Sequence, residues 1–368
     1  SVLVVSALIG LVSLAVSPFL PVWLGGGSDI TPTASAYFAI VATALPIFQF
    51  SIFGAGMLRS SGNMVVPSIM SVVMMSLDVV FNFFLIFPTR PVQLFGAEVT
   101  VPGMGMGVVG AAIGTVSAEL VAASITMYIL CFRSKELSLR IDKGRFLPTW
   151  GVVKRALHIS LPMGLQQTIM CSAYVMTTII IAPLGTFAIA ANSFGVIVES
   201  LCYMPGYGIA DAATTLVGQS IGAGRHELMK RFAWLSVGLG VTVMAVMGVV
   251  MYVGAPVAMA MMTPAEEVRR LGVEVLRIEA FAEPMFAAAI VSYGVFVGAA
   301  KTLVPSIMNL ISIWGVRISL AALLAPSMGL RGVWIAMCIE LCFRGFIFLV
   351  KLKFWNIQTS CNHYGKDQ

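Results

Sequence analysis

The stretch VVPSIM at residues 65–70 returns almost unchanged as LVPSIM at residues 303–308, 238 positions later. Phe, Gly and Pro residues upstream of both stretches match at the same offset. A later pair of segments, GVVGAAIG at 107–114 and GLRGVWIA at 329–336, matches at an offset of 222. Similar segments repeated at a fixed distance indicate that one structural unit occurs twice in the chain.

The composition of the chain is that of a membrane protein. Of its 368 residues, 59% are hydrophobic and only 10% are charged, and the mean hydropathy is +0.96. An ordinary soluble domain has about 25% charged residues. The sequence therefore predicts an integral membrane protein and excludes a soluble globular one.

Apolar runs of about 18 residues or more are long enough to cross the hydrocarbon layer as helices. The chain contains ten candidates, near residues 3–24, 33–57, 65–87, 108–132, 157–182, 187–217, 231–254, 271–298, 303–325 and 331–353. They are too long and too poor in alternation to be strands of a barrel. The predicted fold is an all-α polytopic membrane protein, whose spans are joined by polar connections such as residues 88–106.

The repeat divides these spans into two pseudo-symmetric helical lobes. The N-terminal lobe is residues 1–132, a basic linker follows at 133–156, the C-terminal lobe is residues 157–353, and residues 354–368 form a tail. Helical repeats joined in this way are typical of secondary transporters, in which substrate binds between the halves.

The first copy of the repeat is shorter than the second. The second copy begins near residue 155, so at the same offset the first would begin about 80 residues before residue 1. We therefore expect ten spans of a complete twelve in an N-terminally incomplete chain. We expect this chain to be inactive or unstable by itself, and to transport when the missing spans are supplied.

Basic residues are distributed unevenly between the two sides of the predicted membrane. If the linker is cytoplasmic, 15 of the 22 Lys and Arg residues fall inside and four fall outside. This asymmetry follows the positive-inside rule and predicts a cytoplasmic linker and C-terminus. The net charge of +6 is thus explained by topology, and no basic and aromatic cluster indicates nucleic-acid binding.

Cysteine and histidine do not indicate a structural or catalytic metal site. The six cysteines are scattered, mostly within apolar spans, and form no C-x-x-C pair. The three histidines lack metal-ligand spacing. The sequence therefore predicts neither a disulfide framework nor a zinc site.

Five segments resemble motifs of the multidrug and toxic compound extrusion (MATE) family of antiporters, in the expected order. They are GAGMLRSSGNMVVPS (54–68), MGVVGAAIGT (106–115), LPMGLQQ (161–167), APLGTFAIAANSFG (182–195) and LVGQSIGAGRHELMKR (216–231). The likeness covers essentially the whole chain. Asn63 stands where the family usually has Asp, and Met170 stands where some branches have an acid on the seventh span.

This resemblance implies a V-shaped pair of six-helix lobes around a cavity that opens to one side at a time. It implies export of drugs or other organic cations, driven by Na+ or H+ that enters across the inner (cytoplasmic) membrane. We expect no enzymatic activity and no cofactor beyond the coupling ion. We expect a monomer in the lipid bilayer that binds small cationic or amphipathic substrates.

Carboxylates within the spans are the candidate functional groups, because each costs about 2.5–3.5 kcal/mol to insert at the centre of a helix. Asp78 and Asn82 are four residues apart and so lie on one helix face. Their oxygens could bind Na+, or a proton at Asp78. Thr115 matches a Thr that some family members combine with such a pair. The alternative is a buried Asp that is hydrogen-bonded to Asn and serves helix packing.

Glu279 and Glu283 directly precede Pro284. Because a proline has no N–H to donate to the carbonyl of residue 280, we expect a bend beside the two acids. The acids could attract a cationic substrate or bind a second proton. The alternative is that Glu279 lies near the external end of the span in water, with Glu283 deeper.

Glu199 and Asp211 lie on one predicted span, 12 residues apart and hence about 120° apart around the helix. They should not form one site, although either could face the substrate cavity. The sequence Pro-Gly-Tyr-Gly at 205–208 lies between them. It predicts a flexible break of the kind that occurs in transporter helices.

Glu340 and Arg344 are four residues apart with the acid on the N-terminal side, which predicts a structural ion pair within one helix. Arg317 has no oppositely charged neighbour on its own span. We expect it to pair with Glu340 or Glu279 across the bundle.

Two other functions remain as alternatives to a cation-coupled exporter. A lipid-linked oligosaccharide flippase of the same superfamily would need a basic cavity, whereas the charges within the spans are mainly acidic. An intramembrane transferase would need an acid/base or metal constellation near one membrane face. The sequence has no His/Asp cluster of that kind.

Overall fold

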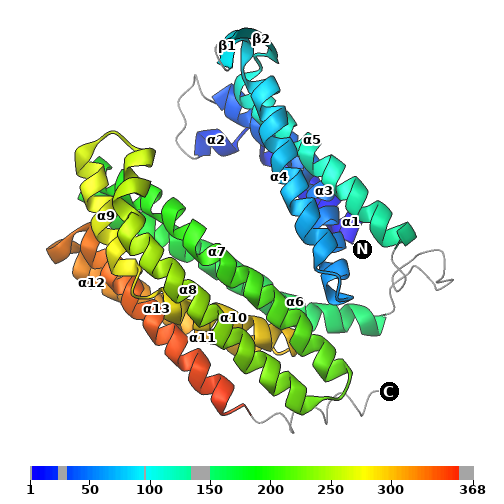
Figure 1. Ribbon diagram of the computed structural model, residues 1–368, viewed down its shortest axis with the longest axis vertical. Coiled ribbons are helices and arrows are strands. Elements are labelled where there is room, and N and C mark those ends of the chain that lie inside the picture. Colours follow the sequence, from blue (N-terminus) through cyan, green and yellow to red (C-terminus); the bar gives the residue numbers. More distant parts are fainter. Residues whose placement is uncertain (1, 24–30, 95–96, 134–149, 356–368) are drawn as a thin grey trace. The chain divides into compact units, whose positions relative to one another are not determined.

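The computed structural model describes residues 2–23, 31–94, 97–133 and 150–355 (Figure 1). The chain divides into two compact units, Ser1–Pro148 and Thr149–Gln368. Within the described ranges, eight helices are long and apolar enough to cross a membrane, or nine if one bent pair counts as a span. The predicted all-α polytopic fold is therefore confirmed, with fewer spans than the ten predicted.

Unit 1 is a small helical bundle. Its elements are α1 (Val2–Val16), α2 (Leu20–Trp23), α3 (Thr31–Ser60), α4 (Val65–Ile86), β1 (Pro88–Leu94), β2 (Ala97–Met104), α5 (Gly107–Tyr128) and the π-helical turn η1 (Ile129–Arg133). Helix α5 packs against both α3 and α4, and α1 packs against α3.

The first predicted span differs from the structure. Residues 3–24 were expected to form one helix, but α1 ends at Val16 and only the short α2 follows it. Pro18 lies between the two helices. A proline disfavours helical geometry at the residue before it and cannot donate a backbone hydrogen bond, so the apolar run is divided.

The connection predicted at residues 88–106 is an antiparallel hairpin of β1 and β2. The guanidinium of Arg90 lies over the rings of Phe83 and Phe87, 5.3 and 3.9 Å from their centroids. These cation–π contacts hold the start of β1 against the last turn of α4. The polar and Gly/Pro composition of this segment indicated a loop and did not reveal the strand pairing.

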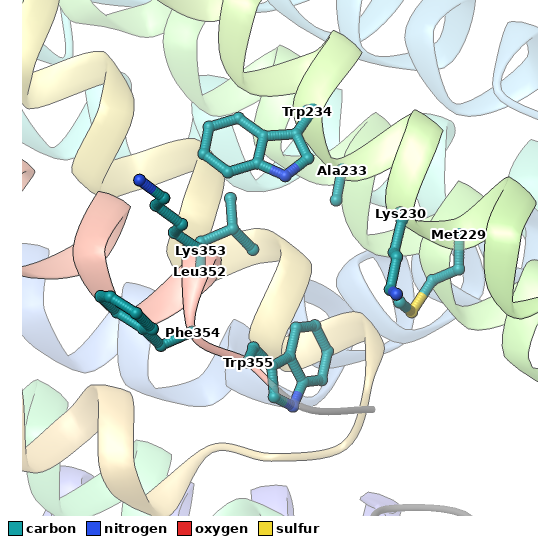
Figure 2. Close-up of a pocket in the computed structure, with 8 residues that line it drawn as sticks. All are labelled: Met229, Lys230, Ala233, Trp234, Leu352, Lys353, Phe354 and Trp355. Carbon is teal, nitrogen blue, oxygen red and sulfur yellow. The ribbon is translucent and has the colours of Figure 1, made fainter. Parts of the chain in front are cut away.

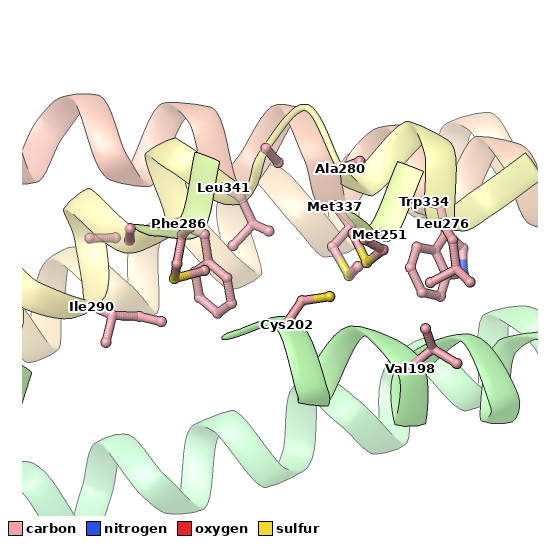
Figure 3. Close-up of a cluster of buried hydrophobic side chains, with 14 of the residues drawn as sticks. Val198, Cys202, Met251, Leu276, Ala280, Phe286, Ile290, Trp334, Met337 and Leu341 are labelled. Carbon is pink, nitrogen blue, oxygen red and sulfur yellow. The ribbon is translucent and has the colours of Figure 1, made fainter. Parts of the chain in front are cut away.

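Unit 2 is a larger bundle around α10. Its elements are α6 (Trp150–Ile181), η2 (Ala182–Leu184), α7 (Thr186–Gly222), α8 (His226–Met262), α9 (Glu266–Glu279), α10 (Glu283–Gly298), α11 (Leu303–Leu310), the π-helical segment η3 (Ile311–Ile318), α12 (Ser319–Met328) and α13 (Leu330–Lys353). Helix α10 packs against α7, α8 and α13, and most of its residues are buried. Figure 3 shows side chains of these helices and of α9 meeting in the apolar core.

The outer faces of the long helices are apolar as well. Val72, Met75 and Val79 form a stripe on α4, at helical spacing, and each is about two-thirds exposed. Leu235 and Val253 on α8 are exposed to the same degree. A helix with apolar residues on its outer face as well as its inner face suits a lipid environment.

The internal repeat is confirmed in the backbone. Helix α10 ends 238 positions after the end of α3, and helix α11 begins 238 positions after the start of α4. In the first turn, the N–H of Asn63 donates to the carbonyl of Leu58 at 2.9 Å. In the second, the N–H of Lys301 donates to the carbonyl of Phe296 at 2.9 Å. The two copies therefore share one helix–turn–helix geometry.

Matching positions of the repeat also share a positive φ. Gly62 has φ of 88° and its counterpart Ala300 has φ of 54°. Gly107 and Gly329, the second matching pair, have φ of 55° and 62°. Positive φ favours glycine because it has no Cβ, so Ala300 is the exception among the four.

The ends of the predicted lobes fall partly outside the described residues. Residues 134–149 of the predicted linker 133–156, and residues 356–368 of the predicted tail, are among those not described. Helix α6 begins at Trp150, so the last residues assigned to the linker are helical.

Candidate functional site

Asp78 and Asn82 lie on the face of α4 that packs against α5. A methyl group added at Gly114 of α5 would collide with the amide oxygen of Asn82, so the absence of a side chain there makes room for Asn82. Oδ1 of Asp78 and Oδ1 of Asn82 are both buried, and neither accepts a hydrogen bond within the described part of the chain. The Asp–Asn hydrogen bond proposed as a packing alternative does not involve these two oxygens.

Thr115 follows Gly114 on α5 and is half-buried. No hydrogen bond joins it to Asp78 or Asn82 among the residues described. Glu119 lies one turn further along α5 and is 5% exposed. The structure thus brings Asn82 next to the turn of α5 that carries Thr115. The three predicted residues are not joined by hydrogen bonds in the described part of the chain.

Glu279 and Glu283 flank the bend that was predicted before Pro284. Helices α9 and α10 meet there at 59°, with Pro284 in the first turn of α10. Gly248 of α8 allows close approach to the bend, since a Cβ at this position would lie 2.7 Å from the carbonyl oxygen of Ala280. The predicted bend is confirmed, and α8 packs against it.

Both carboxyl groups at the bend are enclosed. Glu279 and Glu283 are each 1% exposed, and all four of their carboxylate oxygens lack a hydrogen-bond partner in the described chain. The charges that act on Glu279 are those of Glu199, Arg317, Glu283 and Glu340. The alternative in which Glu279 lies in water at the end of its span is wrong, because α8 and α13 cover the bend.

Glu199 and Asp211 lie in different environments on α7. Glu199 is 6% exposed and faces the interior of unit 2, whereas Asp211 is exposed. The break predicted at residues 205–208 is wrong: α7 continues as one helix from Thr186 to Gly222. Gly206 instead packs directly against the sulfur of Met244 on α8, so it serves a close helix contact.

Glu340 has hydrogen-bond partners of the kind that Glu279 and Glu283 lack among the described residues. Nε of Arg344 lies 2.9 Å from Oε1 of Glu340, and Nη2 of Arg344 donates to Oε2 at 3.1 Å. The hydroxyl of Ser312, on η3, donates to Oε1 at 2.5 Å. The guanidinium of Arg344 also lies 5.5 Å from the ring centroid of Phe286. This cluster joins η3, α10 and α13.

Arg317 does not pair with an acid as predicted. Its Nη2 contacts the sulfur of Met337 on α13, and no ion pair links it to Glu340 or Glu279 in the described residues. Glu340 is already held by Arg344 and Ser312. The sequence showed that Arg317 has no oppositely charged residue on its own span, but it could not show that Met337 would be its neighbour across the bundle.

Some polar residues of the bundle interior were not predicted as functional. Ser312 holds Glu340, and Ser292 on α10 is fully buried with its hydroxyl unpartnered in the described chain. The hydroxyl of Ser306 donates to the side chain of Gln166 at 2.7 Å, which joins α11 to α6. Their only signal in the sequence is a small polar residue within an apolar run. In the described ranges, no group of three or more His, Cys, Asp or Glu residues is arranged to hold a metal ion.

Comparison with known proteins agrees with this architecture. A bacterial relative from Thermotoga maritima, named as a probable multidrug resistance protein NorM, is 27% identical over 327 residues. That alignment covers 88% of this chain and 67% of the relative. A NorM protein from Xylella fastidiosa is 29% identical over 238 residues, which cover 64% of this chain and 50% of that one.

Solved structures have the same fold. A MOP superfamily transporter from Pyrococcus furiosus superposes with a TM-score of 0.85 at 19% identity, covering 96% of this chain and 76% of that one. A MATE transporter from Vibrio cholerae superposes with a TM-score of 0.85 at 18% identity and the same coverage. The MatE family profile matches residues 1–84 and 162–323, about two-thirds of the chain. The chain therefore belongs to the MatE family of multi-pass membrane transporters.

Proposed function

We propose that this chain acts as a secondary active antiporter that exports xenobiotics or other organic cations in exchange for Na+ or H+. The names of the NorM relatives support the multidrug part of this proposal. The observation that carries the cation coupling is that Oδ1 of Asp78 and all four carboxylate oxygens of Glu279 and Glu283 are buried without hydrogen-bond partners in the described residues.

An unpartnered carboxylate inside an apolar bundle is costly, because it has lost its water without gaining another donor. A bound cation or proton supplies the missing charge. An ion that binds one conformation more tightly than another shifts the balance between them. In our proposal, an ion at these acids changes which arrangement of an alternating-access cycle is favoured, and substrate leaves as the ion enters.

The driving force is sufficient for useful export. One charge that crosses a membrane potential of 100 mV contributes about 2.3 kcal/mol. At 1.4 kcal/mol per tenfold, this supports a substrate gradient of roughly 50-fold.

Two sites are candidates for the coupling ion, one in each unit. In unit 1, Asp78 would supply a charge and Asn82 a neutral carbonyl oxygen, with the hydroxyl of Thr115 on the adjoining helix. These are hard oxygen ligands that suit Na+, and Asp78 alone can take a proton. In unit 2, Glu279 and Glu283 would bind a second proton or attract the cationic substrate, with Glu199 adding negative charge.

The charges of the interior favour a cationic substrate over the anionic one of a flippase. In unit 2 the buried acidic side chains are Glu199, Glu279, Glu283 and Glu340, against one buried arginine, Arg344, among the residues described. Arg344 is already paired with Glu340. A flippase for a phosphate-linked saccharide would need basic groups where this unit has acids.

We place the protein in the inner membrane as a monomer, with the linker and the C-terminus in the cytoplasm. The excess of Lys and Arg on one side of the spans supports this orientation.

Efflux of ethidium under an imposed Na+ or H+ gradient, from cells that express the chain together with the two spans expected from its repeat, tests the proposed function. We expect efflux that follows one of the two gradients and is absent from cells with the empty vector. Protein that is present in the membrane but gives no gradient-dependent efflux would contradict the proposal and favour the flippase alternative.

A further inference from the structure

A cavity of about 340 Å³ lies within unit 2, between the first turns of α8 and the end of α13. Its lining comes from two short segments: Met229, Lys230, Ala233 and Trp234, and Leu352, Lys353, Phe354 and Trp355. Figure 2 shows the two segments facing each other across the cavity. The residues that line the cavity are well separated in the sequence from Asp78, Glu279 and Glu283, the acids proposed for ion coupling.

The lining combines positive charge with aromatic rings. Lys230 and Lys353 are both exposed, and no acidic residue is among the described residues that line the cavity. Of the eight lining residues that the structure describes, three are aromatic: Trp234, Phe354 and Trp355. Trp234 is 46% exposed and Phe354 is 74% exposed, which leaves their rings free to contact surrounding lipid. Aromatic rings beside lysines are typical of the boundary between the hydrocarbon and the headgroups.

The floor of the cavity is apolar and fixed. Met229, Ala233 and Leu352 are buried. The ring of Trp355 lies 5.1 Å from that of Phe296, which is itself buried on α10. One wall of the cavity is thus held by the core of unit 2, while the lysines at its rim can move on their flexible stems.

The position along the helices corresponds to the level of the headgroups. Helix α8 begins three residues before the cavity lining, at His226, and α13 ends at Lys353. The apolar span of α8 follows its start at His226, and the apolar span of α13 precedes its end at Lys353. The positive-inside rule assigns these helix ends to the cytoplasmic side, whose leaflet carries anionic lipids.

We propose that this cavity binds the headgroup of an anionic phospholipid. The phosphate group lies between the ammonium groups of Lys230 and Lys353, and the first acyl carbons lie against the buried floor and the exposed rings. The volume is within the range of sites that bind small molecules. Free phosphate would satisfy the lysines equally well, but it would make no use of the apolar floor or the two exposed aromatic residues.

The lipid would join the first turns of α8 to the last turn of α13. Both helices pack against α10, so a ligand that contacts both helix ends should stabilise the folded unit. This inference does not depend on the identity of the coupling ion or of the exported substrate.

Thermal unfolding of the purified, delipidated full chain in detergent tests the proposal. Three additions are compared: phosphatidylglycerol, phosphatidylcholine and inorganic phosphate. We expect phosphatidylglycerol to raise the midpoint of unfolding in a saturable manner, and the other two to have little effect. An equal response to inorganic phosphate would show a free-phosphate site, and an equal response to phosphatidylcholine would show a general lipid effect; either result would overturn the proposal.

A matched pair of double variants locates the site. Lys230→Gln/Lys353→Gln removes the two lining charges, whereas Arg231→Gln/Lys351→Gln removes two exposed charges beside them that do not line the cavity. We expect the first pair to weaken phosphatidylglycerol binding about 30-fold, or about 2 kcal/mol, since each lysine contributes about 1 kcal/mol near an anionic headgroup. Equal weakening in both pairs would overturn the proposal.

Native mass spectrometry of the unmodified protein provides a measurement that does not depend on variants. After exposure to equal amounts of the two lipids, we expect phosphatidylglycerol to be retained in preference to phosphatidylcholine. Equal retention of the two lipids would contradict a specific anionic site.

Discussion

Asp78 in unit 1 and Glu283 in unit 2 are both carboxyl groups inside apolar bundles, yet their surroundings differ. Asp78 is half-buried on a regular helix, one turn from the amide of Asn82. Glu283 is 1% exposed at a bend and has another acid, Glu279, on the opposite side of the break. The first arrangement offers one charge and a neutral ligand, and the second offers two charges. The repeated backbone thus carries two different kinds of candidate ion site.

The two copies of the VPSIM segment show the same divergence. In unit 1 the segment begins α4, a continuous α-helix that carries Asp78. In unit 2 it begins α11, which passes into the π-helical segment η3 and has no acid before α13. Here Ser312 supports the Glu340–Arg344 pair of the neighbouring helix. Common backbone geometry therefore does not predict common chemistry, and each unit has to be tested separately.

The largest effect on stability should come from replacing the paired acid Glu340, and it should far exceed the effect of replacing the unpaired acid Glu283. Glu340→Gln leaves Arg344 buried without its counter-charge, and breaking a buried ion pair costs about 3–5 kcal/mol. Glu283→Gln removes a carboxyl that has no partner in the described chain, so we expect a much smaller change. Thermal unfolding of the two variants in detergent measures the difference, and equal destabilisation would contradict the distinction between the two acids.

Gly114→Ala should affect the site in unit 1. The added methyl group collides with the amide oxygen of Asn82, so α5 or the Asn82 side chain must shift. Overpacking of this kind costs about 1–3 kcal/mol. We expect gradient-driven efflux to fall together with stability. Gly164→Ala on α6, where a methyl group meets no atom within 4 Å, is the control; an equal loss in the control would show that the effect is not local.

The smallest effect should come from the repeated turn. Gly62→Ala places a Cβ at a positive φ and should lower stability by about 1 kcal/mol, whereas Ala300→Gly should leave stability unchanged or raise it by less than that amount. Unfolding midpoints of the two single variants test this contrast. A loss of stability on Ala300→Gly would mean that the methyl group of Ala300 makes packing contacts that outweigh its backbone strain.

Local features of the sequence predicted much of this fold. The apolar runs identified most spans, the repeated segments gave the matching turns, Pro284 gave the bend, and the four-residue spacing brought Glu340 and Arg344 together. Each of these depends on residues that are close in the chain or on a pattern that copies itself. Features of this kind can be predicted from the sequence because they do not depend on contacts between distant helices.

The errors arose where contacts between distant helices decide the outcome. Gly206 was expected to loosen α7 but packs against Met244. The sequence left open whether Glu279 lies in water or in the interior, and the structure covers it at the bend. Arg317 meets the sulfur of Met337 because its expected partner is held by Arg344 and Ser312. None of these pairings has a signature in the sequence of one helix alone.

Ethidium efflux under an imposed Na+ or H+ gradient, measured for Asp78→Asn in the chain supplied with the two expected spans, tests most directly whether the half-buried carboxyl of Asp78 couples ion entry to export. The control is Glu267→Gln, which removes an exposed acid at the start of α9. We predict that Asp78→Asn lowers gradient-driven efflux at least tenfold, with the protein still present in the membrane, and that the control has no effect. Unchanged efflux in Asp78→Asn would contradict this account of unit 1, assign Asp78 to helix packing and move the coupling site to Glu283.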